Sequence, residues 1–192
     1  MNGADQRSEV PLLASSISRL LPPALMLVVL LVLAGLRADL AHVEIVLLLV
    51  GVIGLPGLIY RLLKEPFRRR NIPDRLRVNL LLIFTLTGSV VCFLIPLASP
   101  IPWTVAALFL GNASLVFFRR WLNVSAHVSV LTFVVLWIVA VCGYAWTWLL
   151  VLSPLMAASR VSLREHTGRE ALAGALLGLA TFLCFVMAMT WS

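Results

Sequence analysis

Seven apolar runs separated by short polar links restrict this chain to a small set of folds. We place them at roughly 18–37, 41–63, 78–97, 102–118, 127–143, 145–158 and 169–190. About 20 apolar residues are needed for a helix to cross the hydrocarbon core of a bilayer, where a backbone must satisfy its own hydrogen bonds. The runs therefore predict an all-α, polytopic integral membrane bundle. It would have seven transmembrane helices, or six if one short run is re-entrant or interfacial.

The polar residues are too few to form a separate soluble domain. Only 12% of the residues are charged, against about a quarter in a typical soluble domain. We divide the chain into three parts: a polar N-terminal tail (1–17), N-terminal transmembrane helices (18–101) that include a basic loop (64–77), and a C-terminal group of helices (102–192). The three cysteines all lie inside apolar runs, which indicates small buried side chains rather than a disulfide framework.

The basic residues fall almost entirely on one side of the predicted bundle, which we call side A. Seven crossings from an N-terminus on side A place fourteen of the fifteen lysines and arginines there, all except Arg37. Cytoplasmic loops carry such an excess, so we expect side A to face the cytoplasm, most simply at a bacterial inner (plasma) membrane. We interpret loop 64–77 as a topology signal that binds anionic membrane lipids; contact with a substrate is the alternative.

The link at 159–170 is the most informative segment because it places arginines, a histidine and carboxylates between apolar runs. Charge at a membrane boundary is costly unless it has a function. His166 and Glu170 are four residues apart, a spacing that puts two side chains on one face of a helix. His127, before the fifth run, lies on the same side A, whereas His42 lies on the opposite side. An ordinary interfacial role for these histidines stays open.

These residue types match what hydrolysis of a lipid phosphate ester requires. Guanidinium groups bind the phosphoryl oxygens, and a neutral imidazole attacks phosphorus while a carboxylate orients it. A second imidazole protonates the leaving alkoxide. The chain offers Arg160 with Arg119 or Arg120, His166, Glu170 and His127. The set requires no metal or other cofactor, and we see no carboxylate cluster that would hold a metal.

The same residues resemble the motifs of the type 2 phosphatidic acid phosphatases (PAP2-like membrane lipid phosphatases). That family carries KxxxxxxRP, PSGH and SRxxxxxHxxxD in this order. Ser159-Arg160, His166 and Glu170 match the third motif in every spacing, with Glu in place of Asp. Ser125-Ala-His127 is similar to the second motif. Ala173-Gly174 and Gly178 resemble the small-residue face of the family's last helix. The resemblance covers about residues 102–190 and implies a PAP2-like core there.

The resemblance implies a role for each matching residue. His166 would be the nucleophile that forms a phosphohistidine, Glu170 would orient it, and His127 would be the general acid. Phosphate would be bound by Arg160, Ser125, Ser159, Arg119 and Arg120. The first motif departs from the family pattern, because Lys64 and Arg70 are six residues apart rather than seven. Its substitutes would come from Lys64, Arg75 and Arg77.

We therefore expect a metal-independent lipid phosphatase. Its substrate would be a polyprenyl phosphate or diphosphate, phosphatidate or phosphatidylglycerophosphate. The alternative is a catalytically inactive PAP2-like protein that binds lipid or serves as a scaffold. A small transporter lacks support, since no internal repeat and no charged pair in mid-span are visible. The expected partners are the lipid phosphate and anionic lipids, with no nucleic acid; the sequence leaves a homo-oligomer open.

Overall fold

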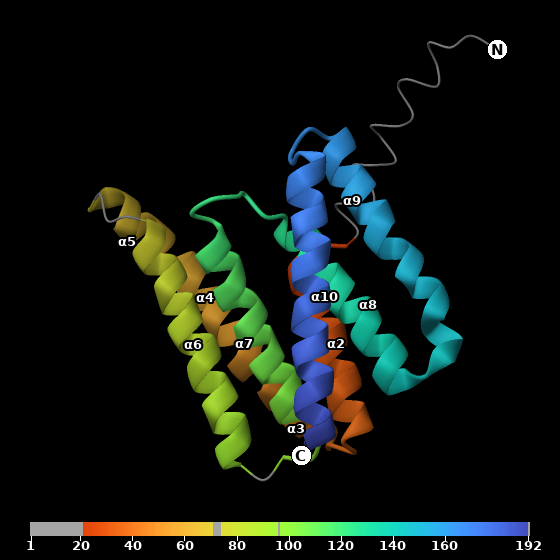
Figure 1. Cartoon of the computed structure of the whole chain (residues 1–192). Helices are drawn as coiled ribbons and strands as arrows, with labels where there is room; N and C mark the ends of the chain where they lie inside the picture. The colour runs from red at the N-terminus through yellow and green to blue at the C-terminus, as the bar shows by residue number, and fades with distance from the viewer. Residues whose placement is uncertain (1–20, 71–73, 96, 192) are drawn as a thin grey trace, which may run out of the picture. The chain divides into compact units, whose positions relative to one another are not determined.

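The computed structural model describes residues 21–191 except 71–73 and 96, and every regular element in that part of the chain is a helix. The predicted all-α fold is therefore confirmed for the described residues. Within the described residues, helix forms in each of the seven apolar runs (Figure 1). The elements are α2 (Pro23–Arg37), α3 (His42–Leu49), η1 (Val50–Gly54), α4 (Leu55–Leu62), α5 (Lys64–Arg69), α6 (Asp74–Leu94), α7 (Ile101–Phe118), α8 (Ala126–Cys142), η2 (Tyr144–Val151), α9 (Leu152–Ser162) and α10 (Gly168–Trp191).

Three of these helical segments are long and apolar enough to cross a membrane. They are His42–Arg69, Ile101–Phe118 and Gly168–Trp191. Three shorter apolar helices accompany them within the described residues: Pro23–Arg37, Val78–Leu94 and Ala126–Cys142. An integral membrane protein is compatible with these lengths, whereas the number of six or seven spans stays a prediction.

The second apolar run continues as helix farther than the sequence suggested. The segment His42–Arg69 contains a π-helical turn, Val50–Gly54, and then continues through α4 and α5. At a rise of 1.5 Å per residue its 28 residues measure about 42 Å, which exceeds the roughly 30 Å hydrocarbon core. The prediction of a basic loop at 64–77 is corrected accordingly, because Lys64–Arg69 is helical and α6 begins at Asp74.

The chain divides into two compact units. The first unit comprises residues 1–27 and 117–183, and the second comprises residues 28–116 and 184–192. The candidate site residues from 119 to 170 all belong to the first unit. The predicted boundary between the N-terminal transmembrane helices (18–101) and the C-terminal group of helices (102–192) stays a prediction.

The second unit contains an apolar cavity of about 470 Å³. Residues of α3, η1 and α4 form one wall, and residues of α6 form another. Nearly all of the lining is aliphatic or aromatic, with Glu44 and Thr87 as polar members. Glu44 accepts a hydrogen bond from the backbone N–H of Ala41 at 2.8 Å, which caps the start of α3. The volume lies in the range of small-molecule pockets.

The first unit is built around α8, α9 and the greater part of α10. Gly143, with φ +104°, ends α8 at the predicted break and lets the chain turn into η2 and α9. The hydroxyl groups of Thr132 and Ser153 lie 2.6 Å apart and join α8 to α9. A buried apolar cluster fills the interior of this unit: Val128, Leu131, Val135, Met156 and Ala171.

Two glycines allow α10 to lie directly against α8. A Cβ atom at Gly174 would lie 2.6 Å from the carbonyl oxygen of Ser125, and one at Gly178 would meet the carbonyl oxygen of Ser129. Small residues four positions apart permit this close approach of two helix backbones. The small-residue face predicted at Gly174 and Gly178 thus packs α10 against the helix that carries His127.

Gly178→Ala is expected to destabilise the protein by about 1–2 kcal/mol. The added methyl group meets backbone atoms of α8, and overpacking of this kind costs about 1–3 kcal/mol, partly offset by the better helix propensity of alanine. Thermal denaturation in detergent measures the effect. Gly57→Ala is the matched control, because an added Cβ there meets no atom of the described chain within 4 Å. Equal melting temperatures for the two variants would contradict the prediction.

Candidate functional site

The turn between α9 and α10 begins with a well-formed helix C-cap. The N–H of Glu165 donates to the carbonyl of Arg160 at 3.1 Å, and the N–H of Arg164 donates to that of Val161 at 3.0 Å. These are the two hydrogen bonds of a Schellman motif, which requires a left-handed residue after the helix. Arg164 takes that position with φ +55°. The turn therefore fixes the direction in which the chain approaches His166.

A capping box then starts α10. The Thr167 hydroxyl accepts from the N–H of Glu170 at 3.3 Å, and Glu170 Oε2 accepts from the N–H of Thr167 at 2.8 Å. A threonine followed three residues later by glutamate is the sequence signature of this motif. Glu170 thus has a structural role in addition to any chemical one. Its carboxylate position is fixed by the helix start rather than by side-chain packing alone.

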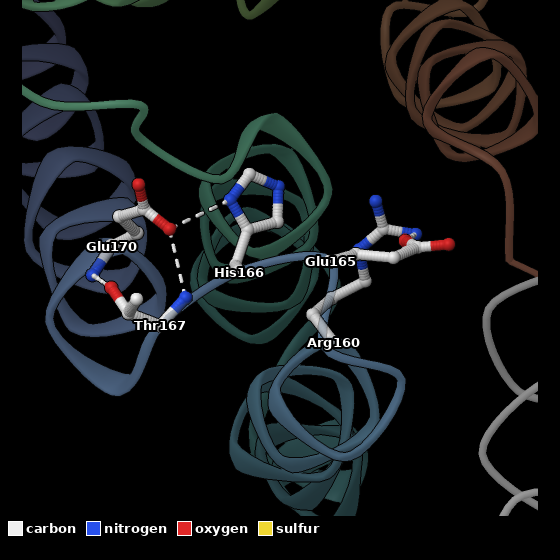
Figure 2. Close-up of polar contacts among 5 residues, drawn as sticks. All are labelled: Arg160, Glu165, His166, Thr167 and Glu170. Carbon is white, nitrogen blue, oxygen red and sulfur yellow. Dashed lines mark hydrogen bonds and ion pairs between the residues drawn. The ribbon is translucent and has the colours of Figure 1, made fainter.

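His166 lies beside Glu170 although the two do not share a helix. The expectation of one helix face is corrected, because His166 precedes α10 and only Glu170 belongs to it. The turn nevertheless brings Nδ1 of His166 to 3.5 Å from Oε2 of Glu170, with both side chains mostly buried. This distance is longer than a well-formed hydrogen bond, so we describe the contact as electrostatic. Figure 2 shows that the other ring nitrogen points away from Glu170.

The N-terminus of α8 meets the same segment. The backbone N–H of Ser125 donates to the carbonyl oxygen of Glu170 at 3.3 Å, which joins the starts of α8 and α10. Ser125 is the N-cap residue of α8, yet its side chain caps none of the first-turn amides. Its hydroxyl oxygen is fully buried and has no hydrogen-bond partner in the described structure. The N-terminus of α8 therefore has no side-chain cap, and we call it open in this sense. The N-terminus of α10 is capped by the Thr167–Glu170 capping box.

His127 and Arg160 complete the group. His127 is the second residue of α8, and Arg160, Glu165 and His166 all lie close enough to interact with it electrostatically. The guanidinium of Arg160, whose side chain is 12% exposed, forms an ion pair with the carboxylate of Glu165. Ser159 precedes Arg160 in α9 and is buried. Residues 39 positions apart thus converge on one region of the first unit.

Two predicted phosphate ligands lie in a turn between α7 and α8. Arg119 and Arg120 occupy the exposed turn after α7, and in the described part of the chain neither forms an ion pair. The proposed first-motif substitutes belong to the second unit: Lys64 is the first residue of α5, and Arg75 and Arg77 lie in the first turn of α6. The side chains of Arg75 and Arg77 lie outside the described residues.

The arrangement is suited to an anion with several oxygen atoms. The N-termini of helices carry unpaired N–H groups and a partial positive charge, and α8 is 17 residues long. A guanidinium and two imidazoles add donors to this open helix start. Within the described residues no group of three or more histidine, cysteine or acidic side chains is arranged to hold a metal ion. The group can bind an anion and carry a nucleophilic nitrogen.

Two residues of this region, Glu165 and Thr167, have no role among the sequence-based predictions. The Thr-x-x-Glu spacing of 167–170 could have revealed the capping box. The ion pair between Arg160 and Glu165 could not be read from spacing, because it depends on the reversal of the chain at Arg164.

Glu170→Gln separates the capping role of Glu170 from a role in orienting His166. Glutamine also serves at the third position of a capping box, so the melting temperature is expected to stay near that of the wild type. The charge beside the imidazole is lost, and the phosphatase activity that the motif resemblance implies should fall on the order of 10–100-fold, the range found for carboxylates that orient metal-bound histidines. Phosphate release and thermal denaturation measure the two effects. Full activity in Glu170→Gln would limit Glu170 to capping.

Comparison of the chain with models of known protein families, with curated proteins and with solved structures gives no match.

Proposed function

We propose that this protein is a PAP2-like membrane lipid phosphatase that acts through a phosphohistidine. The observation that carries the proposal is the contact between His166 Nδ1 and Glu170 Oε2, at 3.5 Å. It leaves the second ring nitrogen of His166 directed away from the carboxylate (Figure 2). The proposal is also supported by the third-motif spacing of Ser159, Arg160, His166 and Glu170.

The roles follow from the positions of the side chains. A carboxylate next to Nδ1 favours the tautomer with the proton on that nitrogen, so Nε2 carries the lone pair that attacks phosphorus. The same carboxylate stabilises the positive ring that forms when Nε2 is phosphorylated. Such contacts are often long without substrate and shorten in the reacting complex. Arg160 and the open N-terminus of α8, with Ser125, would hold the phosphoryl oxygens.

The reaction has two steps. Nε2 of His166 forms a bond to phosphorus, the bond from phosphorus to the lipid oxygen breaks, and protonated His127 gives its proton to that oxygen. Water then attacks the phosphohistidine while His127 takes one of its protons, which releases phosphate and restores His166. Arg160 and the helix N-terminus stabilise the charge on the equatorial oxygens, which is usually the largest part of phosphoryl-transfer catalysis.

The substrate would be a phosphomonoester or diphosphate on a lipid whose tail stays in the bilayer. Polyprenyl phosphate or diphosphate, phosphatidate and phosphatidylglycerophosphate all meet this description. We further propose the inner (plasma) membrane of a bacterium, six or seven spans and a site on the cytoplasmic side. The excess of basic residues on side A supports this orientation. The exposed basic residues of α5, Lys64, Arg68 and Arg69, would contact anionic lipids there.

One observation favours a second candidate function, a non-catalytic lipid-binding or scaffold protein. The apolar cavity of about 470 Å³ in the second unit can hold a lipid chain without any chemistry in the first unit. Such a protein would retain the geometry around His166 and Glu170 as a capped helix start. It would bind lipid phosphates and release no phosphate.

Phosphate release from a panel of lipid phosphates tests the proposal. The purified protein in detergent is mixed with each lipid in turn, and inorganic phosphate is measured over time. Release from at least one lipid, without added metal, supports the phosphatase. Binding of a lipid without release from any of them would favour the non-catalytic candidate.

A further inference from the structure

We propose that Glu165 competes with the substrate phosphate for the guanidinium of Arg160 and thereby sets the affinity of the phosphate site. This inference rests on the proposed function, in which Arg160 binds phosphate. It adds a residue that tunes phosphate affinity and lies outside the motif positions of the phosphatase family. The carboxylate of Glu165, in the turn after α9, already forms an ion pair with the guanidinium of Arg160.

The two members of this ion pair differ in exposure. The Arg160 side chain is 12% exposed and lies on the last turns of α9, whereas the Glu165 side chain is 46% exposed. Figure 2 shows Glu165 beside the guanidinium of Arg160. Glu170 lies on the opposite side of the His166 imidazole. The buried partner is therefore the cation, and the exposed partner is the one that has room to leave.

The backbone does not have to change when Glu165 leaves. The N–H of Glu165 is held by the carbonyl of Arg160 at 3.1 Å as part of the helix C-cap, and this bond is independent of the side chain. Rotation of the Glu165 side chain toward solvent thus breaks its ion pair with Arg160 without any change in the backbone. Exposed side chains change rotamer within nanoseconds, so the exchange would not limit turnover.

A carboxylate and a phosphate place similar demands on arginine. Both present oxygen acceptors that match the guanidinium fork, and both carry negative charge. They cannot occupy Arg160 together without repulsion. A dianionic phosphate gains more from Arg160 than a singly charged carboxylate does, which allows it to displace Glu165.

Binding of inorganic phosphate to the purified full-length protein tests this inference directly. Glu165→Gln keeps the size of the side chain and removes its charge, and we expect phosphate to bind about fivefold more tightly, which corresponds to the upper range for a partly exposed ion pair. Glu65→Gln is the matched control, because Glu65 forms an exposed ion pair with Arg68 at 2.8 Å in the second unit. Calorimetry or ³¹P NMR titration measures both dissociation constants, and the control should leave phosphate affinity unchanged.

Kinetics provide a second readout that a purely structural role would not move. With the best lipid phosphate as substrate, Glu165→Gln should lower KM and leave kcat within about twofold, because uniform binding is gained and the reacting groups are intact. Phosphate affinity equal to or weaker than that of the wild type would overturn the role of Glu165. If the wild type releases phosphate from lipid but Glu165→Gln does not bind phosphate more tightly, the proposed function stands and only the role of Glu165 fails. If the wild type neither binds nor releases phosphate, both proposals fail.

Discussion

His166→Ala is expected to abolish phosphate release, with a loss of at least about 10⁴-fold, since removal of a nucleophile eliminates the covalent route. The imidazole lies in the turn before α10 and is not part of the apolar cluster of the first unit. Its loss leaves the capping box of Thr167 and Glu170 and the C-cap of α9 in place. Melting temperature and yield in detergent should therefore stay close to those of the wild type.

The matched control for this prediction is His42→Ala. His42 begins α3 in the second unit and belongs to none of the motifs. It should retain wild-type phosphate release, which excludes a general effect of losing a histidine. Rapid quenching with a ³²P-labelled lipid phosphate adds a direct measurement, because the phosphohistidine is acid-labile and base-stable. Wild-type turnover in His166→Ala, or a labelled protein that lacks His166, would refute the nucleophile assignment.

His127→Ala is expected to reduce the turnover of alkyl phosphates by about 10²–10⁴-fold, the usual contribution of a general acid. The second position of α8 tolerates alanine well, so the helix should form as before. The defect should depend on the leaving group. An alkoxide needs the proton that His127 supplies, whereas p-nitrophenolate leaves without it.

This dependence gives a sharp test of the role of His127. With p-nitrophenyl phosphate, the His127 variant should release a burst of nitrophenol and then stall, because the second step still requires a base to activate water. The phosphoenzyme should accumulate and become measurable by ³²P labelling. Equal defects for alkyl and nitrophenyl substrates, without accumulation, would show that His127 acts only in binding or folding.

The positions of the helices could be predicted from the sequence because they depend on local patterns. Long apolar runs require helices in a hydrocarbon environment, and the break at Gly143 follows from a residue that adopts positive φ without strain. The loop at 64–77 was predicted wrongly because a local pattern can also mislead. Charged residues at the end of an apolar run were interpreted as the end of the helix, but Lys64–Arg69 continues α4 beyond the length that a bilayer core requires.

The candidate site could be predicted in part. Spacing alone identified His166 and Glu170 as a pair, and the structure brings them to 3.5 Å. The assumed reason was wrong, since a helix C-cap at Arg164 and a capping box at Thr167 position them rather than a shared helix face. Arg119 and Arg120 were also assigned to the site; they lie in an exposed turn after α7, and their part in phosphate binding stays a prediction.

The sequence by itself determined the all-helical fold and the residue types of the candidate site, because helix periodicity, apolar length and motif spacing are properties of neighbouring residues. Only the tertiary structure decided that the N-terminus of α8 meets the first turn of α10, and that Glu165 forms an ion pair with Arg160. These contacts depend on the close approach of α10 to α8 at Gly174 and Gly178 and on the reversal of the chain at Arg164. Contacts of this kind join residues distant in sequence, and no local pattern encodes them.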